Sequence, residues 1–219
     1  MPKWGTFVLI FMSLVAGESP QLPASTHRIS PDVQRVLRVA DSLLEESQAS
    51  YVYGGSRVGS EKECLACSQC LLAKSPEPRR RLVDCPPCRR CGIDCSHFIQ
   101  MVFNRAGFAM PYLDTSLMRS LQPQQLSQRY LLNTVSLKPF DARPGDLLVY
   151  DGHVVLLEKV HRPVVGLPPL RGDIIHATGG GVIRTPGEGI QRERFVELTH
   201  FRGPLRRILR HKSLGYPVF

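Results

Sequence analysis

The feature that most constrains this chain is the spacing of its seven cysteines. Six of them form two C-x-x-C-x-x-C triplets: Cys64, Cys67 and Cys70, then Cys85, Cys88 and Cys91. In an oxidising compartment these six can form three disulfides, which leaves Cys95 as a free thiol. The pairs Cys64/Cys67 and Cys85/Cys88 also have the spacing of a zinc ribbon. Disulfides, a structural zinc site and thiol–disulfide exchange are therefore the three interpretations of the triplets.

The amino terminus has the order of a secretory signal peptide. Lys3 precedes an apolar run from Trp4 to Val15, and the small residues Ala16 and Gly17 follow. Such an arrangement is typically cleaved near the small residues. The apolar run is well short of the roughly 20 residues that a membrane-spanning helix needs. We therefore expect an exported protein, periplasmic or extracellular, that is not an integral membrane protein.

Composition and charge narrow the class of protein. With 219 residues, 42% of them hydrophobic, the chain is long enough for one globular domain and is not typical of a disordered one. Its net charge of +9 favours anionic partners. For an exported protein these are the cell wall and lipid headgroups rather than nucleic acid. Solubility alone explains the same charge equally well.

The hydrophobic pattern predicts helices first and strands afterwards. Ser30-Pro31 is a cap and a first-turn proline, and apolar residues at helical spacing continue to about Ser47. A second helix is predicted to begin at Asp94 or Cys95 and to end at Gly107. Strand patterns follow at 146–150, 153–160 and 173–178, and a hairpin at 179–181 leads to a strand at 182–185. This order predicts an α+β fold with an antiparallel sheet.

The remaining stretches show weaker patterns. Residues 61–91 contain the triplets with little apolar periodicity, and we interpret them as an insertion. A loop region is predicted from Gly107 to Pro139 and a further loop at 163–169. The tail from Arg202 to Lys212 alternates basic and apolar residues. It is interpreted as a solvated helix or strand, with binding to an anionic surface as the alternative.

One cysteine and two histidines are candidates for thiol chemistry. Cys95 would lie at a helix amino terminus, where the unpaired N–H groups favour the thiolate. His153 begins a strand and His176 lies on a later one, and neighbouring strands are about 5 Å apart. A thiol, an imidazole and a polar group that orients it are what nucleophilic catalysis needs. The alternative is a small buried cysteine and two histidines with structural roles.

Five segments resemble, in order, the landmarks of the NlpC family of γ-D-glutamyl endopeptidases. They are Tyr51-Val-Tyr-Gly-Gly55, Gly92-Ile-Asp-Cys-Ser96, Pro144-Gly-Asp-Leu147, Gly152-His-Val-Val155 and Ile175-His-Ala177. The resemblance implies a papain-like fold, in which the cysteine-bearing helix packs on an antiparallel sheet that carries both histidines. It also implies a division into a signal peptide (1–17), an amino-terminal helix region (18–50) and a catalytic domain (51–219) that includes the insert (61–91).

The resemblance implies a role for each matching residue. Cys95 would be the nucleophile, His153 its base and His176 the third catalytic residue, which orients the imidazole. The Cys95 N–H is an expected oxyanion donor, with Tyr51 nearby. By the same resemblance Asp94 and Ser96 would help to bind the substrate peptide, although Asp94 is equally suited to cap the helix. No catalytic metal or cofactor is implied.

Two departures from the family pattern concern the cleft. His97 follows the Asp-Cys-Ser motif where the family usually has glycine, so the cleft beside the nucleophile is expected to be narrower. The loop Pro111-Tyr-Leu-Asp-Thr115 lacks the family's usual polar residues for the substrate tail. The specificity of relatives therefore does not carry over in detail.

The expected function is hydrolysis of peptidoglycan stem peptides at the bond from γ-D-Glu to the diamino acid, by an exported cysteine endopeptidase. A thiol amidase or acyltransferase with another substrate is the first alternative. The second is a zinc-ribbon binding module that uses the positive charge to bind nucleic acid.

Overall fold

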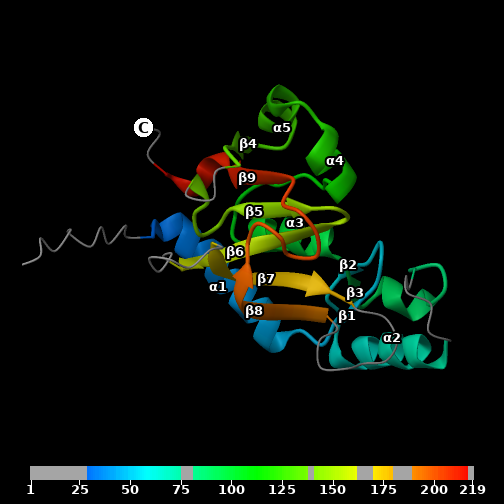
Figure 1. The fold of residues 1–219 in the computed structure, drawn as a ribbon. Coiled ribbons are helices and arrows are strands. Elements are labelled where there is room, and N and C mark those ends of the chain that lie inside the picture. Colours follow the sequence, from blue (N-terminus) through cyan, green and yellow to red (C-terminus); the bar gives the residue numbers. More distant parts are fainter. Residues whose placement is uncertain (1–28, 75–80, 138–140, 162–169, 180–188, 217–219) are drawn as a thin grey trace, which may run out of the picture.

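The computed structural model describes residues 29–74, 81–137, 141–161, 170–179 and 189–216, and its fold is α+β as expected (Figure 1). The predicted signal peptide, the loop at 163–169 and the strand at 182–185 lie outside these residues. Within the described ranges, no helix is long and apolar enough to cross a membrane.

The elements are given in chain order. The first half contains α1 (Pro31–Glu46), β1 (Ser50–Tyr51), β2 (Ser56–Arg57), α2 (Glu61–Ala73), the 3₁₀ helix η1 (Pro86–Arg89), β3 (Gly92–Ile93) and α3 (Cys95–Arg105). The second half contains α4 (Thr115–Ser120), α5 (Pro123–Arg129), β4 (Leu132–Val135), β5 (Leu147–Tyr150), β6 (His153–His161), β7 (Arg171–Thr178), β8 (Gly189–Glu197), β9 (Arg207–His211) and the 3₁₀ helix η3 (Lys212–Leu214).

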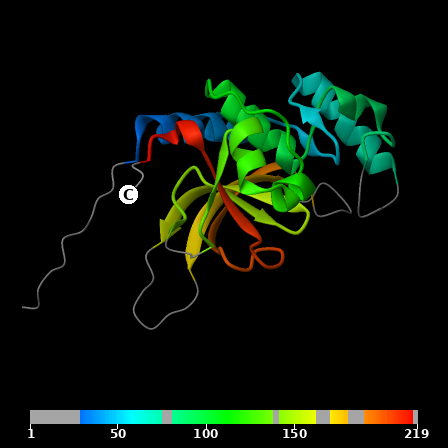
Figure 2. The ribbon, with the colours of Figure 1, turned by 90° about the horizontal axis from the view of Figure 1, so that it is seen from above.

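A six-stranded antiparallel sheet in the order β4-β9-β5-β6-β7-β8 forms the centre of the protein. Alternate strand residues face opposite sides. Val149, Val154 and Ile175 belong to one apolar cluster with the buried faces of α1 and α3. Leu148 and Val155 belong to the cluster on the other face. Figure 2 shows α1 and α3 on one side of this sheet.

The two predicted helices are confirmed together with their ends. The Ser30 hydroxyl accepts a hydrogen bond from the Val33 N–H, which caps α1. The Asp94 carboxylate caps α3 in the same way through the His97 N–H. Gly107 follows α3 with a φ of +83°, a conformation that glycine adopts without steric cost. The strand patterns at 146–150, 153–160 and 173–178 correspond to β5, β6 and β7.

Two predictions about the weaker stretches were wrong. Residues 107–139 are not only loop, because they contain α4, α5 and β4. The tail is not solvated: β9 lies between β4 and β5, and its Ile208 and Leu209 are fully buried. Two basic residues of β9 are bonded within the fold: Arg207 donates to two carbonyl groups at α4, and Arg210 pairs with Asp146.

The cysteine-rich insert is a helix tied by three disulfides to the segment that follows it. The pairs are Cys64–Cys91, Cys67–Cys88 and Cys70–Cys85. Cysteines three residues apart on α2 lie on one side of the helix, so the bonds form a ladder. All six sulfurs are used, which argues against the zinc alternative and fits an oxidising compartment.

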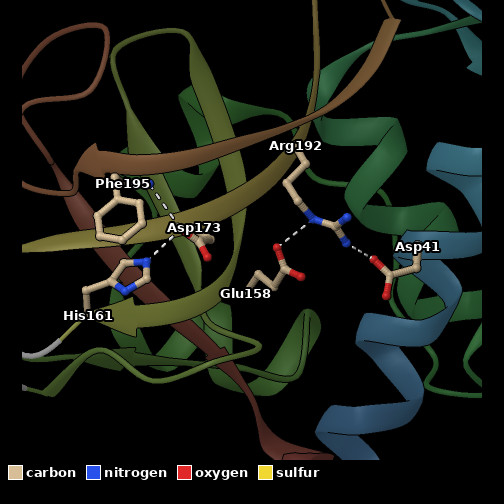
Figure 3. A network of polar contacts seen from close by, with 6 residues as sticks. All are labelled: Asp41, Glu158, His161, Asp173, Arg192 and Phe195. Atoms are coloured by element: carbon tan, nitrogen blue, oxygen red, sulfur yellow. Dashed lines mark hydrogen bonds and ion pairs between the residues drawn. The ribbon is translucent and has the colours of Figure 1, made fainter.

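Two clusters of polar contacts join the edge strand β8 to its neighbours (Figure 3). Arg192 on β8 donates to Glu158 on β6 and also pairs with Asp41, so it ties α1 to the sheet. His161 contacts the Asp173 carboxylate at 2.7 Å, and its ring stacks on Phe195 at a centroid distance of 4.0 Å. These contacts join β6, β7 and β8 at positions where the ladder registers shift.

Candidate active site

Close backbone packing sets the position of Cys95, the first residue of α3. The short strands β1, β3 and β2 form a small sheet, and the Asp94 N–H donates to the Gly55 carbonyl at 3.0 Å just before the helix begins. A Cβ atom on Gly55 would lie 2.5 Å from the Gly92 carbonyl carbon, so only glycine fits there. This contact brings the Tyr51–Gly55 segment beside the cysteine.

A buried chain of hydrogen bonds runs across β6, β7 and β8. His153 Nε2 lies 2.7 Å from His176 Nδ1, and His176 Nε2 lies 3.0 Å from a Glu193 carboxylate oxygen. His153 is 6% exposed and His176 is completely buried. Burial lowers the pKa of both imidazoles, to about 3 for His153 and about 2 for His176, so both rings are neutral at pH 7.

This chain determines which nitrogens carry protons. A carboxylate only accepts hydrogen bonds, so His176 Nε2 carries the proton in its contact with Glu193. His176 Nδ1 is then an acceptor, and His153 Nε2 donates to it. His153 Nδ1 consequently keeps its lone pair, and it hydrogen bonds to no described residue. Nδ1 is therefore the nitrogen of His153 that is able to accept a proton.

The Cys95 sulfur lies where β1, α3 and β6 meet. The N–H groups of Cys95, Ser96 and Val154 lower the pKa of the thiol, and the Cys95 sulfur in turn raises the pKa of the Tyr51 phenol. Val154 directly follows His153, so the thiol lies at the start of the strand that carries the histidine. Burial of Tyr51 raises the pKa of its phenol, which therefore stays protonated and able to donate.

At Cys95 burial opposes the effect of the helix amino terminus, which was expected to favour the thiolate. Burial, followed by the charge of Asp94, raises the pKa of the Cys95 thiol to about 11. The three backbone N–H groups lower it by less. Since His153 is neutral as well, the resting site contains a thiol and an imidazole rather than an ion pair.

Asp94 serves as a structural cap in this site. One carboxylate oxygen accepts from the Ser96 hydroxyl and the His97 N–H, and the other contacts the Gly54 N–H and His97 Nδ1. These contacts are 2.8–3.0 Å long. A substrate amine would have to compete with these four protein groups for the Asp94 carboxylate. The contacts of Asp94 therefore support the capping role rather than the expected role in peptide binding.

His97 forms one wall of the site together with Tyr112. The two rings are stacked at a centroid distance of 4.0 Å, and the Ser96 hydroxyl lies 3.5 Å from that of Tyr112. Because His97 also contacts Asp94, its ring is held at both its face and its edge.

Glu193 and Phe201 belong to the site but were not among the predicted residues. The Phe201 ring centroid lies 5.5 Å from that of His176 and 6.3 Å from that of His153, so it covers both imidazoles. The β7–β8 register pairs His176 with Gln191, which places Glu193 two residues along the same face. If β8 had been predicted, its pairing with β7 would have placed Glu193 near His176. The residues of β8 are mostly polar, so the sequence gave no strand pattern there.

The neutral resting pair has a measurable consequence for alkylation. Cys95 is the one described cysteine outside the disulfides. With a thiol pKa of about 11, its rate of reaction with iodoacetamide should rise about tenfold per pH unit between about pH 6 and 9. The Cys95→Ala variant, which should not be labelled, is the control. A rate that is flat over this range would indicate a preformed thiolate and contradict the prediction.

Comparisons with known proteins add no family to this geometry. No protein-family model matches the chain, and no curated protein matches it. Among the described residues, no group of three or more His, Cys, Asp and Glu side chains could hold a metal ion.

Proposed function

We propose that the chain is an exported cysteine peptidase of papain-like, NlpC-type fold that hydrolyses peptidoglycan stem peptides, at the bond from γ-D-Glu to the diamino acid. The observation that carries the proposal is the buried chain from Glu193 through His176 to His153. It leaves a basic nitrogen on a histidine whose neighbour, Val154, contacts the Cys95 sulfur. Buried imidazoles with strongly lowered pKa values are more frequent at functional sites than elsewhere in proteins.

In the first step, the thiol attacks the scissile carbonyl carbon. The Cys95 sulfur forms a bond to that carbon while His153 Nδ1 takes the thiol proton, and the carbonyl oxygen becomes an oxyanion. We assign the Cys95 N–H and the Tyr51 hydroxyl as donors to that oxygen, since both groups interact with the Cys95 thiol. The positive charge that forms on His153 is shared through His176 with the Glu193 carboxylate.

In the second step, the carbon–nitrogen bond breaks and His153 Nδ1 returns its proton to the leaving amine. A thioester on Cys95 remains. Water then attacks the thioester while His153 Nδ1 accepts its proton, and the carboxylic acid leaves as the thiol is restored. His153 Nε2 keeps its proton throughout, because His176 Nδ1 accepts that hydrogen bond.

Two further observations support an anionic wall peptide as substrate. Arg202 is exposed and carries no ion pair to a described residue, and its charge acts on His153, His176 and Tyr51 together. A carboxylate near the scissile bond would find this guanidinium at the mouth of the site. The net charge of +9 would likewise favour approach to an anionic wall.

The test is mass spectrometry of purified peptidoglycan fragments after incubation with the mature protein. We expect cleavage between D-Glu and the diamino acid by the wild type and none by Cys95→Ala, because the nucleophile is lost. Cys95→Ala retains all three disulfides, so its fold is a matched control. Thioester accumulation or transfer to added amines without stem cleavage would indicate the amidase or acyltransferase alternative. No reaction by either protein would refute the proposal.

A further inference from the structure

A hollow of about 400 Å³ lies between the insert and the carboxyl end of α3. The residues around it that matter here are Ser56, Arg57, Glu63, Arg90, Met101 and Arg105. They come from β2, α2, the turn after η1 and α3, so four separate segments converge on one space. The hollow is not part of the candidate active site.

Three guanidinium groups dominate the charge of this hollow. Arg57, Arg90 and Arg105 are exposed, and none of them forms an ion pair or a side-chain hydrogen bond with a described residue. Glu63 is the one acid lining it; its carboxylate accepts from the Ser60 N–H and hydroxyl, and the charges of Arg90 and Arg57 also help to lower its pKa. Three guanidinium groups against one carboxylate leave an excess of two positive charges. Unpaired like charges repel each other, so their convergence costs energy unless an anion offsets it.

The frame that holds these arginines is rigid. Arg90 lies between Cys88 and Cys91, and both of these are in disulfides to α2. A Cβ atom on Gly59 would lie 2.5 Å from the Arg90 carbonyl oxygen, so the β2–α2 loop packs directly on that turn. The hollow is therefore formed in advance of any ligand.

We propose that this hollow binds a phosphate group carried by an organic ligand. Guanidinium groups suit phosphate because their paired N–H groups match two of its oxygens. The volume falls within the range of small-molecule sites and exceeds what one phosphate ion fills. The Ser56 hydroxyl can add a neutral contact, and Met101 offers an apolar surface to the group that bears the phosphate.

The hollow is separated in space from Cys95. Cys95 and Arg105 are the first and last residues of α3, and at 1.5 Å of rise per residue they are about 15 Å apart. A ligand in the hollow would not touch the thiol. The inference is accordingly independent of the proposed peptidase activity, and the site gives the insert a role in retention on phosphate-bearing material.

The test compares two double variants that lose the same charge. Arg90→Gln with Arg105→Gln removes two guanidinium groups from the hollow, whereas Arg38→Gln with Arg129→Gln removes two exposed ones from α1 and α5. Calorimetric titration with glycerol phosphate and with inorganic phosphate gives the dissociation constants. We expect saturable binding to the wild type, unchanged in the control and at least about tenfold weaker in the hollow variant.

Two further measurements identify the source of the phosphate and check the role of the positive charges. Sedimentation with phosphatidylglycerol vesicles, against phosphatidylcholine vesicles, shows whether a lipid headgroup is bound as well as a soluble ester. Arg90→Lys with Arg105→Lys should restore part of the affinity. The same loss in the control variant would mean that only net charge matters, and no loss in the hollow variant would mean that Arg90 and Arg105 do not bind the ligand. Either result would overturn the proposal. So would the absence of saturable binding to the wild type.

Discussion

Replacing His176 by phenylalanine is expected to lower kcat for stem cleavage by about 10³–10⁴-fold, with little change in KM. Phenylalanine fits the buried space but offers no acceptor to His153 Nε2. The His153 ring is then free to turn or to carry its proton on Nδ1, where it cannot act as a base. The same loss of tautomer control has an effect of this size in serine proteases.

A matched variant separates this role from simple packing. In His176→Asn, the side-chain oxygen lies close to the position of Nδ1 and can accept from His153, so most of the activity should return. Glu193→Gln should have a smaller effect, because its amide oxygen can still accept from His176 Nε2. If His176→Phe keeps activity within about tenfold of the wild type, the buried chain does not control the base.

Replacing Arg210 by methionine is expected to destabilise the protein by about 3–5 kcal/mol, because the carboxylate of Asp146 would remain buried without its partner. Asp146 is fully buried, and Arg210 contacts both its oxygens at 2.7 Å. The guanidinium also lies 4.8 Å from the Tyr216 ring centroid. For a chain of this length the melting temperature should fall by about 6–20 °C.

The double variant Asp146→Asn with Arg210→Met is the control, and it should recover part of the loss because no charge is then buried. The pH dependence has a definite sign. Burial already raises the pKa of Asp146 in the intact pair, and loss of Arg210 would raise it further. A raised carboxyl pKa costs stability as pH rises, so the deficit of Arg210→Met against the wild type should shrink as pH falls. A deficit that is independent of pH would contradict this account.

Local signals in the sequence were sufficient for the elements that position the site. Ser30 and Asp94 cap helices whose apolar residues recur at helical spacing, and β5 to β7 are apolar runs bounded by turns. The motifs around Cys95, His153 and His176 predicted which groups would meet. His153 and His176 meet at one end of the sheet, and Cys95 at the start of α3 lies beside Val154 there.

What the sequence did not reveal depends on pairing over long distances. β9 is recognisable as an interior strand only once β4 and β5 are known to flank it. The residues that pair with β9 in these two strands are more than 50 positions away in the chain. β8 is an edge strand with few buried residues, so its pattern gave no prediction of Glu193. The thiol pKa also depends on burial, a property of the assembled fold that outweighs the helix terminus.

The disulfide ladder implies an order of oxidation during folding. The bonds are nested, with sequence separations of 15, 21 and 27 residues, so Cys70–Cys85 closes the shortest loop. Once it has formed, Cys67 and Cys88 are drawn together, and then Cys64 and Cys91. The same spacing next leads to Glu61 and Asp94, neither of which is a cysteine. The ladder therefore ends one residue short of Cys95, which stays outside the disulfides.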